Sequence, residues 1–297
     1  MNLFLSQFIE HDLVPILLGI IVGINCALIG SFLVVRRESL LSDSISHSVL
    51  PGIVGSFLIF GSRKIEYMIL GSLVSGTISA SLSYLIYRLG KIEKGASYGI
   101  VFSSFFALGV LLLEGFNQNG VDLDIDCVLS GQIDSIFWSI PKTLSLKSIL
   151  LSFPEELYYV LINLLIILFL IKILYKEILI SSFDYQFAKL YNFKPNLISL
   201  ILVIITTLTV VTSFSSVGSI IVIALTIIPA NIAKSFTNNF RYILILSASF
   251  ATISVLLGYY LALYLIQDIA LSIGGMIAFS SFILLLISLL FKNKNVS

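Results

Sequence analysis

Charged residues are scarce in this chain. Asp, Glu, Lys and Arg together make up 11% of its 297 residues, whereas a soluble globular domain has about 25%. Hydrophobic residues make up 58% of the sequence. Such a composition excludes an ordinary soluble domain, and we expect an integral membrane protein.

Cysteine and methionine are scarce as well. The two cysteines, Cys26 and Cys127, are too few and too far apart for a disulfide framework or a thiolate metal site. Three methionines are too few for a methionine-rich path that would carry a soft ion such as Cu(I). Of the two histidines, we expect His11 to lie at the membrane interface, which leaves His47 as the candidate for chemistry.

Sequence signatures of enzymes are missing. The chain has no His-Glu-x-x-His zinc motif, no Gly-x-Ser-x-Gly nucleophile elbow and no Gly-x-x-x-x-Gly-Lys-Ser/Thr phosphate loop. We therefore expect a protein that is not an enzyme. Any transport that it performs must draw its energy from an ion gradient or from another chain.

What the chain does have is a series of long apolar stretches. Most are close to the ~20 residues that a membrane-spanning helix needs, whereas barrel strands are shorter and alternate apolar with polar residues. The stretches therefore predict an all-α polytopic membrane protein with about eight or nine transmembrane helices. The expected crossings are Leu13–Val35, Ser42–Ser62, Tyr67–Tyr87, Gly95–Leu113, Leu157–Tyr175, Tyr242–Gln267, Ile269–Phe291, and two helices within Pro195–Ala233 that the polar run Thr212–Gly218 separates.

The distribution of basic residues predicts the orientation. With the N-terminus outside, all but four of the 17 Lys and Arg residues fall on the cytoplasmic side, as the positive-inside rule requires. The longest external stretch, residues 115–156, is an acidic loop suited to attract cations or to dock an external delivery protein. Residues 176–194 form a cytoplasmic loop.

One titratable pair lies inside a predicted crossing. Asp43 and His47 are four residues apart, so a helix places both side chains on one face. A charge at bilayer depth costs roughly 2.5–3.5 kcal/mol, which makes a functional role the first hypothesis. The alternative is that the two side chains only bond to each other.

A carboxylate and an imidazole suit Mn, Fe(II) or Zn. Two such ligands are too few to strip a divalent ion of its water, but a two-fold homodimer would supply two carboxylates and two imidazoles around one ion. Serines surround the pair, and we expect their hydroxyls to orient the ligands by hydrogen bonds; they are Ser39, Ser42, Ser46 and Ser48.

The cytoplasmic loop 176–194 contains an amphipathic segment. We expect Ser182 to cap a short helix there. Its apolar stripe consists of Phe183, Phe187, Leu190 and Tyr191. Such a helix either rests on the membrane surface or fits into a cytoplasmic partner.

Several stretches of the chain resemble one transporter family. Residues Cys26–Gly52 read CALIGSFLVVRRESLLSDSISHSVLPG, and this run strongly resembles the signature of the ABC-transporter permeases for zinc, manganese and iron. Further similar stretches, in the same order along nearly the whole chain, are Tyr98–Gly109, Val121–Asp124, Ser182–Ala188 and Val217–Ala230.

The resemblance implies a single transmembrane permease domain over residues 1–297 with the type II ABC importer fold. It also implies a homodimer in the bacterial cytoplasmic (inner) membrane, surrounded by lipid, supplied by an extracytoplasmic metal-binding protein and powered by separate cytoplasmic ATPase subunits. The transported manganese, zinc or iron ion is the expected ligand, with no permanently bound cofactor and no nucleic acid. Asp43 and His47 match the family's metal ligands, and its ATPase-coupling segment matches Phe183, Asp184, Phe187 and Leu190.

Three other functions remain open at this point. A permease of the same architecture for a metal chelate, such as a siderophore, would need a wide path without ligands. A gradient-driven secondary transporter or channel would not associate with an ATPase. An intramembrane metalloenzyme would need a third protein ligand near Asp43 and His47, and the sequence offers none.

Overall fold

The computed structural model describes residues 11–62, 64–117, 133, 136, 138, 152–183, 185–191, 193–265 and 272–291. The longer regular elements in these residues are all helices, because a helix satisfies its own backbone groups where lipid offers them no partner. In chain order they are α2 (Leu13–Val35), α3 (Leu40–Ser48), α4 (Leu50–Phe60), α5 (Ile65–Gly90), α6 (Lys94–Asn117), α9 (Glu155–Phe183), α10 (Tyr185–Leu190), α11 (Pro195–Val217), α12 (Ser219–Phe236), α13 (Phe240–Tyr260), the π-helix η3 (Leu261–Leu265) and α14 (Ile273–Leu290).

The described residues contain nine segments that are long and apolar enough to cross a membrane. Helices α3 and α4 together form one of them, Leu40–Phe60. The predicted all-α class and the predicted number of crossings are therefore confirmed. Most of the expected external loop 115–156 lies outside the described residues.

The chain divides into two compact units. Unit 1 consists of residues 1–28, 129–166 and 212–297, and unit 2 consists of residues 29–128 and 167–211. The single permease domain expected over residues 1–297 stays a prediction.

In unit 1, helices α12, α13 and α14 pack against one another. Gly218 separates α11 from α12 with a φ of 86°, a backbone conformation that glycine adopts without steric cost. The long uncharged stretch Pro195–Ala233 is thus two helices, as the sequence predicted, and the first of them continues to Val217.

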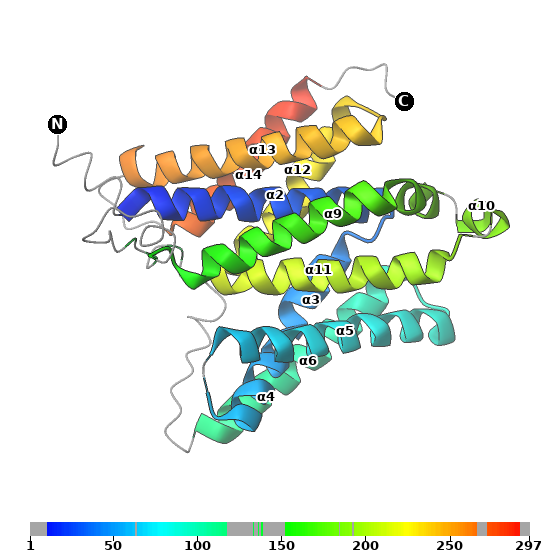
Figure 1. Ribbon diagram of the computed structural model, residues 1–297, viewed down its shortest axis with the longest axis horizontal. Helices are drawn as coiled ribbons and strands as arrows, with labels where there is room; N and C mark the ends of the chain where they lie inside the picture. The colour runs from blue at the N-terminus through cyan, green and yellow to red at the C-terminus, as the bar shows by residue number, and fades with distance from the viewer. Residues whose placement is uncertain are drawn as a thin grey trace. The chain divides into compact units, whose positions relative to one another are not determined.

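Unit 2 carries the candidate metal site. Its short helix α3 packs against α5 and α6, and α4 packs against the same two helices (Figure 1). The Ser75 hydroxyl of α5 donates a hydrogen bond to the Ser48 carbonyl at 2.6 Å, which ties α5 to the end of α3. The contacts of α3 therefore hold it between two long helices.

Glycines allow α4 and α5 to approach each other closely. A Cβ atom added at Gly52 would clash with the Gly71 backbone carbonyl and would lie 2.7 Å from the Ser75 Cβ. Small residues at a helix crossing let backbones come near each other in a membrane, where packing contacts drive association. Gly52 and Gly71 therefore bring the backbones of α4 and α5 together.

We expect the substitution Gly52→Ala to lower the stability of unit 2. The added methyl group forces α4 and α5 apart, and overpacking of this kind costs about 1–3 kcal/mol. The measurement is the thermal unfolding midpoint of the purified chain in detergent. Gly55→Ala, in the same helix, is the matched control because a Cβ there meets nothing within 4 Å; equal midpoints for the two variants would contradict the prediction.

Candidate metal site and coupling segment

Helix α3 presents one partly exposed face and buries the rest of its surface. Leu41, Ser42, Ile45 and Ser48 are buried. Asp43 and His47 share the other face, with side chains that are 32% and 28% exposed. The helix thus places both candidate ligands where an ion or a second chain can reach them.

The two candidate ligands point toward each other. The His47 Nε2 lies 3.4 Å from the Asp43 Oδ1. The His47 ring also packs against two aromatic rings of α6, with centroid distances of 5.3 Å to Phe102 and 5.9 Å to Phe106. These contacts hold the imidazole beside the carboxylate, which is the arrangement that two ligands of one ion require.

Two of the four neighbouring serines do not have the role that the sequence suggested. The Ser46 hydroxyl donates to the Ser42 carbonyl at 3.0 Å, and the Ser48 hydroxyl donates to the Ser44 carbonyl at 2.7 Å. A serine hydroxyl reaches the carbonyl one turn earlier in its own helix, and this bond satisfies it inside an apolar surrounding. Ser46 and Ser48 therefore bond to the helix backbone of α3 and do not orient Asp43 or His47.

One chain supplies too few ligands for a closed metal site. Within the part of the chain that the structure describes, no group of three or more His, Cys, Asp and Glu side chains is placed to hold a metal ion. A tetrahedral site needs four donors. Asp43 and His47 are therefore half of a site at most.

A second polar cluster lies at the start of α3. The Glu38 carboxylate accepts hydrogen bonds from the Arg36 Nε at 3.0 Å and from the Lys94 Nζ at 2.7 Å, while the Arg36 Nη2 donates to the Ser199 Oγ at 2.7 Å. Burial raises the pKa of Glu38, but the nearby charge of Arg36 and the hydrogen bond and charge of Lys94 outweigh it, so the pKa lies below its ordinary value. Glu38 thus joins the end of α2 to α6, and Arg36 extends the cluster to α11.

We expect Glu38→Gln to destabilise the protein by roughly 2 kcal/mol near neutral pH, since it removes the carboxylate charge and one of the two acceptor oxygens and keeps the side-chain shape. A lowered pKa stabilises the fold above the ordinary value of 4.5, and this contribution is lost as the pH falls through the pKa of the folded state. The difference in unfolding midpoint between wild type and variant should therefore be constant above about pH 5.5 and shrink below pH 4.5. A difference independent of pH would contradict this reading, and the exposed Glu93→Gln is the control.

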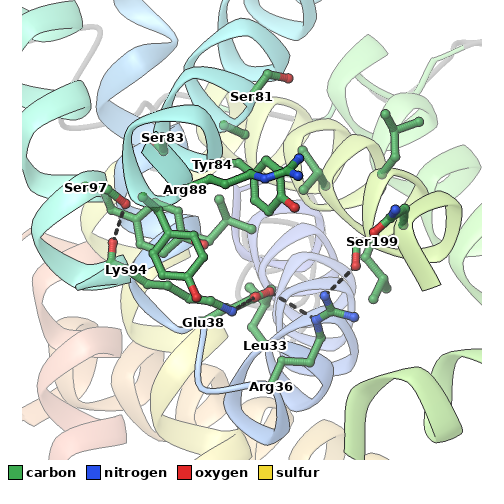
Figure 2. A pocket seen from close by; sticks show the side chains of 18 of the residues that line it. Leu33, Arg36, Glu38, Ser81, Ser83, Tyr84, Arg88, Lys94, Ser97 and Ser199 are labelled. Atoms are coloured by element: carbon green, nitrogen blue, oxygen red, sulfur yellow. Dashed lines mark hydrogen bonds and ion pairs between the residues drawn. The ribbon is translucent and has the colours of Figure 1, made fainter. Parts of the chain in front are cut away.

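Beside this cluster, unit 2 contains a cavity of about 720 Å³. Arg36, Glu38 and Lys94 lie together along one side of it, and Arg88 extends across it from α5 (Figure 2). The sequence showed these basic residues only as charges of the predicted cytoplasmic side. Nothing in their spacing indicated a shared cavity, because they come from three separate segments of the chain.

The predicted coupling segment is exposed. Phe183 ends α9, and Phe187 and Leu190 belong to the following helix α10. Phe183 is 63% exposed and Leu190 is 84% exposed. Asp184, which the sequence also assigned to this segment, lies outside the described residues.

The predicted helix cap in this segment is wrong. Ser182 lies inside α9, and its hydroxyl donates to the Ile178 carbonyl at 2.6 Å. The apolar run before Ser182 extends its helix by a further turn, so the hydroxyl bonds backward into α9 and does not cap α10. The exposed apolar stripe remains, with the Phe187 and Tyr191 rings 4.6 Å apart.

The described residues thus contain nine apolar segments, an acid–histidine pair inside one of them and an exposed apolar segment between two of them, features typical of a membrane transport subunit. The chain belongs to the ABC 3 transport family, whose profile matches residues 10–292. It is therefore a multi-pass permease of the bacterial cytoplasmic (inner) membrane and not an enzyme, with ATP hydrolysis in a separate chain.

Relatives with described functions support this assignment. The chain is 37% identical to the manganese transport system membrane protein MntD of Bacillus subtilis, over 87% of this chain and 85% of that protein. It is 32% identical to the zinc transport system membrane protein TroC of Treponema pallidum, over 86% and 81%. Its fold is similar to that of PsaBC from Streptococcus pneumoniae, solved in complex with a Fab, with a TM-score of 0.77, 28% identity, and coverage of 97% of this chain and 94% of that one.

Proposed function

We propose that this chain is the permease subunit of an ABC importer that moves a divalent transition metal ion across the cytoplasmic membrane. The observation that carries the proposal is the Asp43–His47 pair, with its ligand atoms 3.4 Å apart on the partly exposed face of a membrane helix. Relatives named for manganese and zinc transport support these two metals as cargo. Iron suits the same ligands, and it stays a prediction from the sequence.

The complete metal site forms, in this proposal, between two copies of the chain. Each copy contributes Asp43 and His47, so a two-fold axis gives four donors with a charge that balances a divalent ion. Support comes from the partial exposure of both side chains and from the lack of a third ligand in the described part of one chain. The carboxylates supply charge, and the imidazoles select against Ca²⁺ and Mg²⁺, which prefer oxygen ligands.

Coupling to ATP hydrolysis uses the exposed segment around α10. Phe183, Phe187 and Leu190 form an apolar surface that, in this proposal, enters a groove of the cytoplasmic ATPase subunit; Asp184 is assigned to the same contact from the sequence alone. Exposed aromatic and aliphatic side chains of this kind are typical anchors in protein interfaces. An extracytoplasmic metal-binding protein delivers the ion. ATP binding by the cytoplasmic ATPase subunits then opens the metal site toward the cytoplasm.

The test is transport by the reconstituted importer. The tagged chain is isolated under native conditions with the ATPase that co-purifies, placed in lipid vesicles with the delivery protein, and assayed for uptake of radioactive manganese and zinc. We expect uptake that requires ATP and the delivery protein. Uptake driven by a proton or sodium gradient without ATP would reject the proposal in favour of a secondary transporter, and uptake of a chelate but not of the free ion would favour a chelate permease.

A further inference from the structure

The cavity in unit 2 has the charge of an anion-binding site. Its described lining includes three cations, Arg36, Arg88 and Lys94, and one acid, Glu38. Glu38 already pairs with Arg36 and Lys94. Arg88 has no ion-pair partner among the described residues. The lining therefore carries positive charge that the described residues do not balance.

One buried donor of this lining has no partner. The Arg36 Nη1 is buried and makes no hydrogen bond within the described part of the chain, although the other two nitrogens of the guanidinium bond to Glu38 and Ser199. A buried charged donor without a hydrogen-bond partner is unfavourable, so it adds to the positive potential of the lining. An acceptor with several oxygens, such as a phosphate group, would pair with Arg88 and balance the charge of the Arg36 guanidinium.

The cavity carries its charged residues at one end and is uncharged along its depth. Along α5 its lining runs from Arg88 back to Thr77, a distance of roughly 16 Å at 1.5 Å per residue. The basic side chains lie at the end that the positive-inside rule assigns to the cytoplasm, whereas Ala80 and Val203 lie deeper. This depth is close to one leaflet, about half of a 30 Å hydrocarbon core.

We propose that this cavity binds an anionic phospholipid, with the phosphate headgroup between Arg36 and Arg88 and an acyl chain along α5. The ligand that suits the cavity has a phosphate group attached to an apolar chain. Basic pockets between membrane helices on the cytoplasmic side favour anionic lipid headgroups for this reason. The transported ion does not suit the cavity, because three cations surround the single acid and repel a divalent metal.

The test measures which lipid the purified full-length chain retains. The chain is incubated in mixed micelles with equal amounts of dioleoyl phosphatidylglycerol and dioleoyl phosphatidylcholine, and the bound lipids are counted by native mass spectrometry. We expect phosphatidylglycerol to predominate. Arg88→Gln should lower the ratio of bound phosphatidylglycerol to phosphatidylcholine by about fivefold, the effect of one basic residue near a lipid headgroup.

Two further variants separate the cavity from general charge and folding effects. Ser81→Phe leaves every charge in place and fills the cavity from α5, so it should lower the retention of phosphatidylglycerol as Arg88→Gln does. Arg241→Gln removes an exposed cation of α13 that does not line the cavity and should leave the ratio unchanged. A ratio that both Arg88→Gln and Ser81→Phe leave at the wild-type value would overturn the proposal.

Two further measurements distinguish a bound phospholipid from two other possible occupants of the cavity. If inorganic phosphate raised the unfolding midpoint of the wild-type chain as much as phosphatidylglycerol does, the site would bind a free anion and the lipid assignment would be wrong. If binding of the ATPase subunit displaced phosphatidylglycerol, the cavity would belong to the ATPase interface and the lipid assignment would again be wrong. Retention of the lipid in the complex with the ATPase supports it.

Discussion

Replacement of Asp43 by Asn or of His47 by Ala is expected to lower metal uptake by at least about 100-fold. Loss of even an outer-shell partner of a metal ligand costs 10–100-fold in affinity. In a two-fold dimer, His47→Ala removes two of four donors and Asp43→Asn removes both negative charges. The Asp43→Asn change keeps the size of the side chain and removes its charge. The measurement is the initial rate of ATP-dependent manganese or zinc uptake into vesicles.

The matched control for this prediction is His11→Ala. His11 is the other histidine of the chain and lies just before α2, in unit 1. We expect this variant to transport at close to the wild-type rate. Wild-type uptake by both Asp43→Asn and His47→Ala would reject the metal site, while loss of uptake in His11→Ala as well would show that the assay reports damage to the fold.

The second large expected effect is the loss of ATPase binding on substitution in the exposed segment around α10. We expect Leu190→Ala, and more strongly the double variant Phe183→Ala with Leu190→Ala, to weaken binding of the ATPase subunit by about tenfold and up to about 100-fold. Burial of a leucine or phenylalanine side chain contributes roughly 1.5–3 kcal/mol, and every 1.4 kcal/mol is a factor of about ten in affinity. The measurement is the amount of ATPase that co-purifies with the tagged chain, together with its hydrolysis rate.

Leu290→Ala serves as the control for the coupling segment. Leu290 ends α14 and is 85% exposed, similar to the 84% of Leu190. Truncation of a leucine that does not contact the ATPase should leave binding of the ATPase unchanged. Retention of the ATPase at the wild-type level by the Leu190 and Phe183 variants would mean that α10 rests on the membrane surface, the alternative that the sequence left open, whereas equal losses from the Leu190 and Leu290 variants would show a general effect of truncation.

The sequence located the candidate ligands because their signal is local. Asp43 and His47 are four residues apart, and a helix of any orientation brings such side chains to one face. The structure adds that the rest of α3 is buried and that Phe102 and Phe106 flank the imidazole. The aromatic contacts come from α6, more than 50 positions later, and no periodicity in either segment indicates them.

The predictions for Ser46 and Ser48, and for Ser182, were wrong for one physical reason. A serine hydroxyl has a carbonyl of its own helix within reach whenever the helix extends one turn before it. The sequence does not say which of several nearby partners the hydroxyl takes, so Ser46 and Ser48 were assigned to the ligands and Ser182 to a cap. In the structure all three donate to the helix backbone.

By itself, the sequence determined the membrane class, the number of crossings, the break between α11 and α12 and the helical face that carries Asp43 and His47. Each of these follows from composition or from neighbours a few residues apart, since apolar length and helical periodicity act locally. Only the tertiary structure decided that Gly52 meets Gly71, that Glu38 pairs with Lys94 and that Arg36 and Arg88 line one cavity. Those contacts join segments far apart in the chain, and the packing of whole helices fixes them.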